Sequence, residues 1–177
     1  MGMWAEWRAQ RARSRRASTY LGRLLRTPDQ ADIAWLGSAG VTVTLAAREL
    51  TFAKRAIGLI VAERDALDDR TASDVAHQLV SVMSWEARGS VNLGLAWDER
   101  WRAYTAALAV RGSVEAPATR LARVLLLGAG IAEPSQEQVV RATQFVNETR
   151  GAANVALRDV FGAASLPDDV RPSALLS

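Results

Sequence analysis

The sequence lacks most of the residues from which common active sites are built. It contains no cysteine and a single histidine, His77. The absence of cysteine excludes disulfides, thiolate metal sites and cysteine nucleophiles. One histidine cannot supply the two Glu-x-x-His motifs of a di-iron bundle, and no Gly-x-Ser-x-Gly motif is present for serine catalysis. We therefore expect no catalytic, metal or cofactor site, and we expect His77 to be an ordinary surface or core side chain.

Long hydrophobic runs are also missing. The uncharged stretch 33–47 spans 15 residues and includes Gly37 and Gly40, whereas a membrane-spanning helix needs about 20 apolar residues. The sequence therefore favours a cytoplasmic protein. Association with the cytoplasmic face of a membrane stays open as an alternative.

Positive charge is abundant but unevenly placed. The chain has 21 arginines and one lysine, Lys54, a bias typical of GC-rich bacterial genomes. Seven of the arginines lie in the first 26 residues beside one acid, Glu6, so that this segment has a net charge of +6 and residues 27–177 have −3. A charge separation of this kind indicates attachment to an anionic partner.

Turn-forming residues divide the rest of the chain into helical segments. Glycines, prolines and capping residues predict helices over about 29–69, 72–111, 118–131 and 135–164. The apolar–threonine alternation of residues 40–45 is interpreted as helix because its flanks are rich in alanine. The predicted fold is all-α: an antiparallel up-down bundle of four to five helices (27–165), with a basic N-terminal helical arm (1–26) and an extended C-terminal tail (166–177).

The hydrophobic pattern also predicts how these segments pack. Leu36, Val43, Leu50 and Ile57 recur every seven residues, which predicts one long helix with a close antiparallel neighbour. Gly58 and the Gly37/Gly40 pair are the candidate positions for a kink or an end of this helix. The segment 72–111 is apolar on more than one face. A helix of that kind is expected to be buried by several neighbours.

The basic arm is the main candidate binding site. Trp4 and Trp7 lie one helical turn apart, and Leu21 and Leu24 extend an apolar strip. The candidate residues for binding a partner or an anionic surface are Trp4, Trp7, Arg8, Arg11, Arg13, Arg15, Arg16 and Arg23. A protein partner or larger complex is favoured as the target, and an anionic membrane surface or nucleic acid stays open.

A second candidate site consists of aromatic residues. The chain has six tryptophans and three phenylalanines, a composition more usual at interfaces than in small cores. The candidate aromatic interface comprises Trp85, Trp97, Trp101 and Tyr104. The last three are spaced as one helical stripe, for which core packing is the commoner role.

Three charged residues interrupt apolar stripes. Glu86 and Arg100 fall on the face of Leu79 and Leu93, and Arg150 falls between Val146 and Ala153. Since buried charges require partners, Glu86 and Arg150 are the candidate buried charge pair. The alternative is that Glu86 is the functional carboxylate of a pocket lined by aromatic residues.

The tail contains two prolines and ends in Leu175-Leu176-Ser177, which is typical of disorder or of a docking peptide. Taken together, these features predict a non-catalytic helical interaction protein, an accessory or assembly subunit that docks through its arm and exposed aromatics. A nucleic-acid-binding regulator is the first alternative, and a ligand carrier or enzyme with a Glu86/aromatic pocket is the second. Self-association is open.

Overall fold

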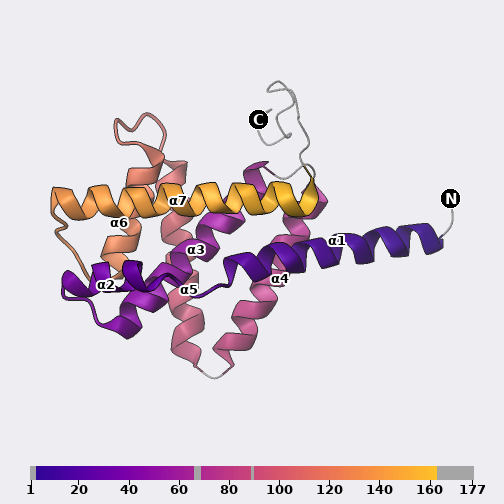
Figure 1. The fold of residues 1–177 in the computed structure, drawn as a ribbon, viewed down its shortest axis with the longest axis horizontal. Coiled ribbons are helices and arrows are strands. Elements are labelled where there is room, and N and C mark those ends of the chain that lie inside the picture. Colours follow the sequence, from indigo (N-terminus) through magenta and orange to yellow (C-terminus); the bar gives the residue numbers. More distant parts are fainter. Residues whose placement is uncertain (1–2, 66–68, 89, 163–177) are drawn as a thin grey trace.

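The computed structural model describes residues 3–65, 69–88 and 90–162, and the regular secondary structure of this part of the chain is all helix, without strands. Figure 1 shows its seven helices. They are α1 (Met3–Leu24), α2 (Gln30–Ser38), α3 (Val43–Asp65), α4 (Asp69–Ala87), α5 (Val91–Ala109), α6 (Pro117–Gly128) and α7 (Gln136–Phe161). The predicted tail, with its Leu175-Leu176 end, lies outside the described residues.

The all-α class is confirmed, but the predicted number of helices was wrong, because a glycine breaks the first long segment. Gly40 has a φ of +87°, and the Val41 N–H donates to the Leu36 carbonyl at 3.2 Å. This is the hydrogen bond with which a left-handed glycine ends a helix. The seven-residue repeat continues through the break, and its member Val43 is consequently 67% exposed.

The segment 72–111 is likewise two helices, α4 and α5, which form a hairpin (Figure 1). The segment has several neighbours, as predicted, since α4 packs against α1 and α3 and α5 packs against α3 and α6, but these helices do not cover all of its faces. Val80, Trp85 and Leu95 are 57%, 68% and 63% exposed. The hairpin therefore lies at the edge of the molecule, where one side of each helix faces solvent.

The centre of the core is α3, which packs against each of the other six described helices. Every residue from 52 to 62 is buried except Lys54. A helix buried on all faces needs neighbours on all sides. Figure 1 shows α7 crossing α3 and α6 rather than lying alongside them, which differs from the simple up-down arrangement that was predicted.

The predictions for the last two helices agree with α6 and α7 to within a few residues, because their ends have strong local signals. Gly130 has a φ of +86°, and the Ile131 N–H donates to the Leu126 carbonyl at 2.9 Å. At the start of α7, Ser135 and Gln138 form a reciprocal capping box, a known start signal for helices.

Helix α1 is attached to the core near its C-terminal end. The Tyr20 hydroxyl donates a hydrogen bond to the Gly58 carbonyl of α3 at 2.8 Å. A Cβ atom at Gly58 would collide with the buried Leu24 side chain. The glycine therefore permits the close approach of α1 to α3, and this contact sets the direction in which the rest of α1 extends.

Candidate docking surface on helix α1

Helix α1 has two halves with different surroundings. Ala17, Tyr20, Leu21 and Leu24 are buried in the core, so the expected apolar strip at Leu21 and Leu24 faces the protein. From residue 4 to residue 16, each described side chain is exposed apart from a half-buried arginine. Figure 1 shows this N-terminal half projecting beyond the other helices.

Polar contacts with neighbouring helices support the middle and the end of α1. The Gln78 side chain of α4 donates to the Ser14 carbonyl at 3.0 Å and accepts from the Ser18 hydroxyl at 2.8 Å. Arg13 lies 3.9 Å from Asp74 of α4, and Arg23 lies 2.7 Å from Asp159 of α7. Arg13 and Arg23 were predicted to bind an external anion, but the structure places both beside acids of the same chain.

The solvent face of the projecting half combines aromatic and cationic side chains. Trp4, Arg8, Arg11 and Arg15 recur at intervals of four, three and four residues, which places them on one side of a helix. The Trp4 and Trp7 rings meet edge to face with centroids 5.9 Å apart. The Arg11 guanidinium lies 3.9 Å from the centre of the Trp7 ring, a cation–π geometry that orders both side chains.

Four arginines of this half, namely Arg8, Arg11, Arg15 and Arg16, have no ion pair with any described acid. Among the described residues, the one hydrogen bond that these four side chains make runs from Arg8 Nε to the Trp4 carbonyl at 3.3 Å. Trp4 and Trp7 are 70% and 47% exposed. These side chains form a helix surface with free cations and exposed indoles. We name it the α1 docking surface, and it consists of Trp4, Trp7, Arg8, Arg11, Arg15 and Arg16.

The predicted aromatic interface is divided in the structure. Trp97 and Tyr104 are buried, and Trp101 is half-buried. Trp97 stacks on Trp101 with centroids 6.1 Å apart and meets Phe52 of α3 at 5.6 Å. This stripe fills the core between α3 and α5, whereas Trp85 is exposed on α4, apart from it.

The predicted partner of Glu86 was wrong. Glu86 accepts two hydrogen bonds from Arg55 of α3, at 2.6 and 2.9 Å, while Arg150 is exposed on α7. Arg55 itself is buried, so its charge requires this carboxylate. The pair joins α3 to α4, which is the structural role that a buried pair was expected to have.

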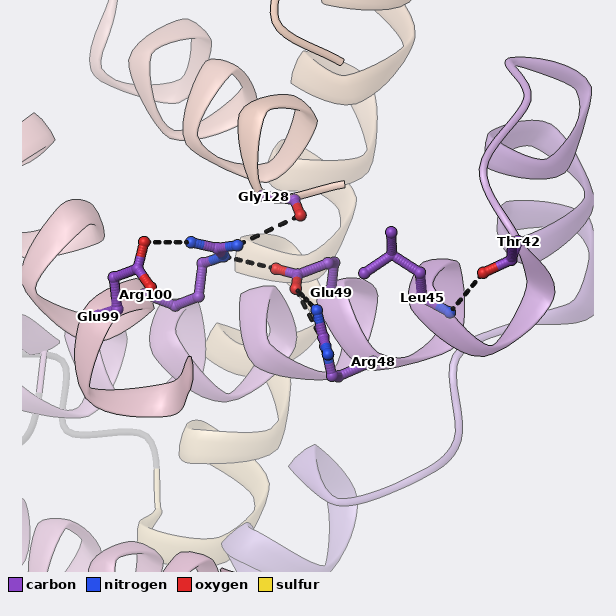
Figure 2. A network of polar contacts seen from close by, with 7 residues as sticks. All are labelled: Thr42, Leu45, Arg48, Glu49, Glu99, Arg100 and Gly128. Carbon is purple, nitrogen blue, oxygen red and sulfur yellow. Dashed lines mark hydrogen bonds and ion pairs between the residues drawn. The ribbon is translucent and has the colours of Figure 1, made fainter. Parts of the chain in front are cut away.

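The most buried carboxylate was not found from the sequence. Glu49 of α3 is completely buried and lies 2.7 Å from Arg100 of α5 and 2.9 Å from Arg48. Figure 2 shows the Arg100 guanidinium bound to Glu49 and to the Gly128 carbonyl of α6, to which it donates at 3.2 Å. The signal available in the sequence was the position of Glu49 between Ala46 and Ala53, which belong to the apolar repeat.

Tyr104 lies next to this network. Burial, reinforced by the nearby Glu49 charge, raises the pKa of Tyr104 far above its ordinary value. Its hydroxyl has no hydrogen-bond partner among the described residues. Through Arg100, which binds Glu49 and the Gly128 carbonyl, this charge network holds α3, α5 and α6 together.

Two further expectations concern metals and membranes. His77 is exposed on α4, and within residues 3–65, 69–88 and 90–162 no three His, Cys, Asp or Glu side chains gather as a metal site would require. None of the described helices combines the length and the apolar character needed to cross a bilayer.

Comparison with known proteins adds no assignment. The chain matches no protein-family model, no curated protein and no solved structure. Its function must therefore be argued from its own geometry, in which the α1 docking surface is the largest concentration of uncompensated charge described above.

Proposed function

We propose that this chain is a non-catalytic, cytoplasmic interaction protein, an accessory or assembly subunit that docks through the α1 docking surface on an acidic face of a protein partner. The observation that supports this most directly is the set of four arginines without acidic partners beside two exposed tryptophans. Tryptophan and arginine are the residue types most enriched among the energetically dominant contacts of protein interfaces.

The arrangement of α1 favours a protein over a membrane as the docking target. A helix that lies in a bilayer surface separates its apolar residues from its charged residues on opposite faces. Here Trp4 shares one face with Arg8, Arg11 and Arg15, and the opposite face carries Glu6 and Arg13. Mixed aromatic and arginine character on one face suits a protein surface with apolar pockets surrounded by carboxylates.

The test is an affinity purification from the source cells, in which co-purifying proteins are quantified for the wild type and for two charge-reversal variants. The first variant is Arg8→Glu/Arg11→Glu/Arg15→Glu. The second is the matched control Arg88→Glu/Arg102→Glu/Arg111→Glu, in which the same change of charge falls on exposed arginines of other regions. We expect one partner to be recovered with the wild type and the control, and to be lost with the α1 variant and with Trp4→Ala/Trp7→Ala.

Anionic vesicles of phosphatidylglycerol and phosphatidylcholine, duplex DNA and single-stranded RNA serve as the competing targets. Binding to any of them that depends on the α1 arginines, without an arginine-dependent protein partner, would overturn the proposal. A steep loss of such binding with salt would identify the nucleic-acid regulator. A protein partner that the α1 variant retains would also contradict it.

A further inference from the structure

A cavity of about 520 Å³ lies where the end of α1, the connection to α2, α3 and α7 meet. It is separate from the α1 docking surface, because its α1 residues are Arg23 and Leu24. Its volume falls within the range of small-molecule binding sites. Lys54, the single lysine of the chain, is one of its lining residues.

The cations of this cavity are only partly compensated. The Lys54 ammonium donates one hydrogen bond, to the Arg26 carbonyl at 3.1 Å, and it has no ion pair with a described acid. The exposed Arg26 guanidinium likewise has none. Burial lowers the pKa of Lys54, although Asp29 and Asp32 oppose this effect. The half-buried Lys54 ammonium therefore has one hydrogen-bond acceptor and no ion pair with a described acid.

The acids of the cavity are mostly engaged elsewhere. Asp32 accepts a hydrogen bond from Arg141 at 2.6 Å. Glu148 accepts from the Gln144 side chain at 2.7 Å and lies 3.9 Å from Arg141. Neither Arg141 nor Gln144 lines the cavity. Asp29, at the start of α2, is the remaining acid and is exposed. Arg23, the third lining cation, pairs with Asp159 at 2.7 Å, so the lining cations without an ion pair to a described acid are Lys54 and Arg26.

Part of the cavity lining is apolar. Phe145, Ala153 and Ala156 of α7 and Leu24 of α1 are buried lining residues. Such a wall removes a hydrocarbon chain from water, which stabilises binding by about 25 cal/mol for each Å² of apolar surface covered. The lining thus combines two cations without ion pairs to described acids, Lys54 and Arg26, with buried apolar side chains.

We infer that this cavity binds a small amphiphilic anion, with a carboxylate or phosphate head between Lys54 and Arg26 and a short hydrocarbon tail against Phe145 and the alanines of α7. The ammonium and guanidinium supply charge-assisted hydrogen bonds to the head. The inference does not depend on the proposed docking function, since the two sites share no residue.

The single lysine makes a direct test possible. When lysine alone is labelled with ¹⁵N, Lys54 is the only source of a lysine backbone amide signal in NMR spectra. The probes are hexanoate, hexyl phosphate and the neutral control hexanol, all with the same tail. We expect at least one of the anions to shift the Lys54 signal with a dissociation constant of about 1 mM or lower, and hexanol to bind about tenfold more weakly. Comparing the two anions identifies the preferred head group.

Calorimetry on variants separates a specific site from general attraction of anions. Lys54→Met and Arg26→Met should each weaken binding of the preferred anion about tenfold, whereas Arg102→Met, on the exposed face of α5, should leave it unchanged. Ala152→Phe adds bulk at an exposed lining position of α7 and should block both anions. Circular dichroism establishes that each variant is folded.

Three results would overturn the inference. The first is equal affinity for hexanol and both anions. The second is anion binding that Lys54→Met and Ala152→Phe both leave intact. The third is no shift of the Lys54 signal by either anion at concentrations up to about 10 mM.

Discussion

Arginines of α1 and arginines of the core show how one residue type has two roles in this molecule. Arg8, Arg11 and Arg15 project into solvent without acidic partners. Arg55 and Arg100, by contrast, bind carboxylates of neighbouring helices at 2.6 and 2.7 Å. The difference lies in the surroundings: a buried cation must be neutralised, whereas an exposed one is stabilised by water and stays available. The number of arginines in a segment therefore indicates less about their role than the position of the acids around them does.

From this comparison, the largest loss of stability is expected when the buried pair of Glu49 and Arg100 is broken. Arg100→Met leaves Glu49 completely buried with only the half-exposed Arg48 beside it, and should lower the free energy of unfolding by about 3–5 kcal/mol. Urea denaturation measures this. The double variant Glu49→Met/Arg100→Met removes both charges and should recover most of the loss. A single variant as stable as the wild type would show that the pair does not stabilise the fold.

Gly128 tests the same network without removing a charge. A Cβ atom there would lie 2.5 Å from Arg100 Nε and 2.6 Å from Glu49 Oε2. Gly128→Ala should therefore displace the ion pair and cost about 1–3 kcal/mol. The control is Gly151→Ala, at an open helical position of α7, where alanine should stabilise by up to about 1 kcal/mol. Equal effects of the two substitutions in urea denaturation would contradict the predicted crowding.

The two buried tyrosines extend the comparison to neutral hydroxyl groups. Tyr20 donates a hydrogen bond to Gly58, whereas Tyr104 has no such partner among the described residues. At neutral pH, Tyr20→Phe should cost about 1 kcal/mol and Tyr104→Phe less than about 0.5 kcal/mol. Thermal denaturation of both variants measures the difference, and a greater loss at Tyr104 would be inconsistent with its unpaired hydroxyl.

The same tyrosines predict an alkaline limit of stability. Burial raises the pKa of both hydroxyl groups above the ordinary value of 10.0, so the unfolded chain loses these protons at lower pH than the folded one. Their contribution is complete below pH 10.0 and is lost above it, by about 1.4 kcal/mol per pH unit for each tyrosine. Tyr104→Phe should reduce that slope by about one such increment, whereas an unchanged slope would mean that Tyr104 does not contribute.

The smallest expected effect is at the solvent-exposed arginines. Arg8→Glu/Arg11→Glu/Arg15→Glu changes exposed side chains without intramolecular acidic partners, so the free energy of unfolding should change by less than about 0.5 kcal/mol. Urea denaturation beside the Arg100→Met variant gives the contrast directly. A loss above about 1 kcal/mol would show that these arginines support the fold rather than remain available for a partner.

Part of this fold could be predicted from local sequence, because helix ends with a glycine or a serine cap are local features. The Gly37/Gly40 pair was named as a candidate kink or end, but the hydrophobic repeat continues through it and does not show which of the two occurs. The anchoring of α1 could have been found as well. Ala17, Tyr20, Leu21 and Leu24 follow the spacing of a buried helical face, yet the surrounding arginines dominated the interpretation.

The candidate sites were less accessible to sequence reasoning, because they depend on contacts between distant parts of the chain. Glu49 and Arg100 are 51 residues apart, and periodicity cannot show which charges of separate helices meet. The position of Arg23 beside Asp159 depends on the packing of α1 against α7 in the same way. The arginines and tryptophans at the exposed N-terminal end are different, since their clustering is local and can be seen in the sequence.

The contact between Tyr20, Leu24 and Gly58 has a consequence for any partner that binds the far end of α1. Because the helix is continuous from Met3 to Leu24, the indole of Trp4 is joined to the first buried residue, Ala17, by a stiff spacer about 20 Å long. Binding to such a preorganised element involves little loss of conformational entropy. A partner that binds Trp4 is therefore held at a fixed distance and orientation from the rest of the molecule, because α1 is a stiff helix and not a flexible linker.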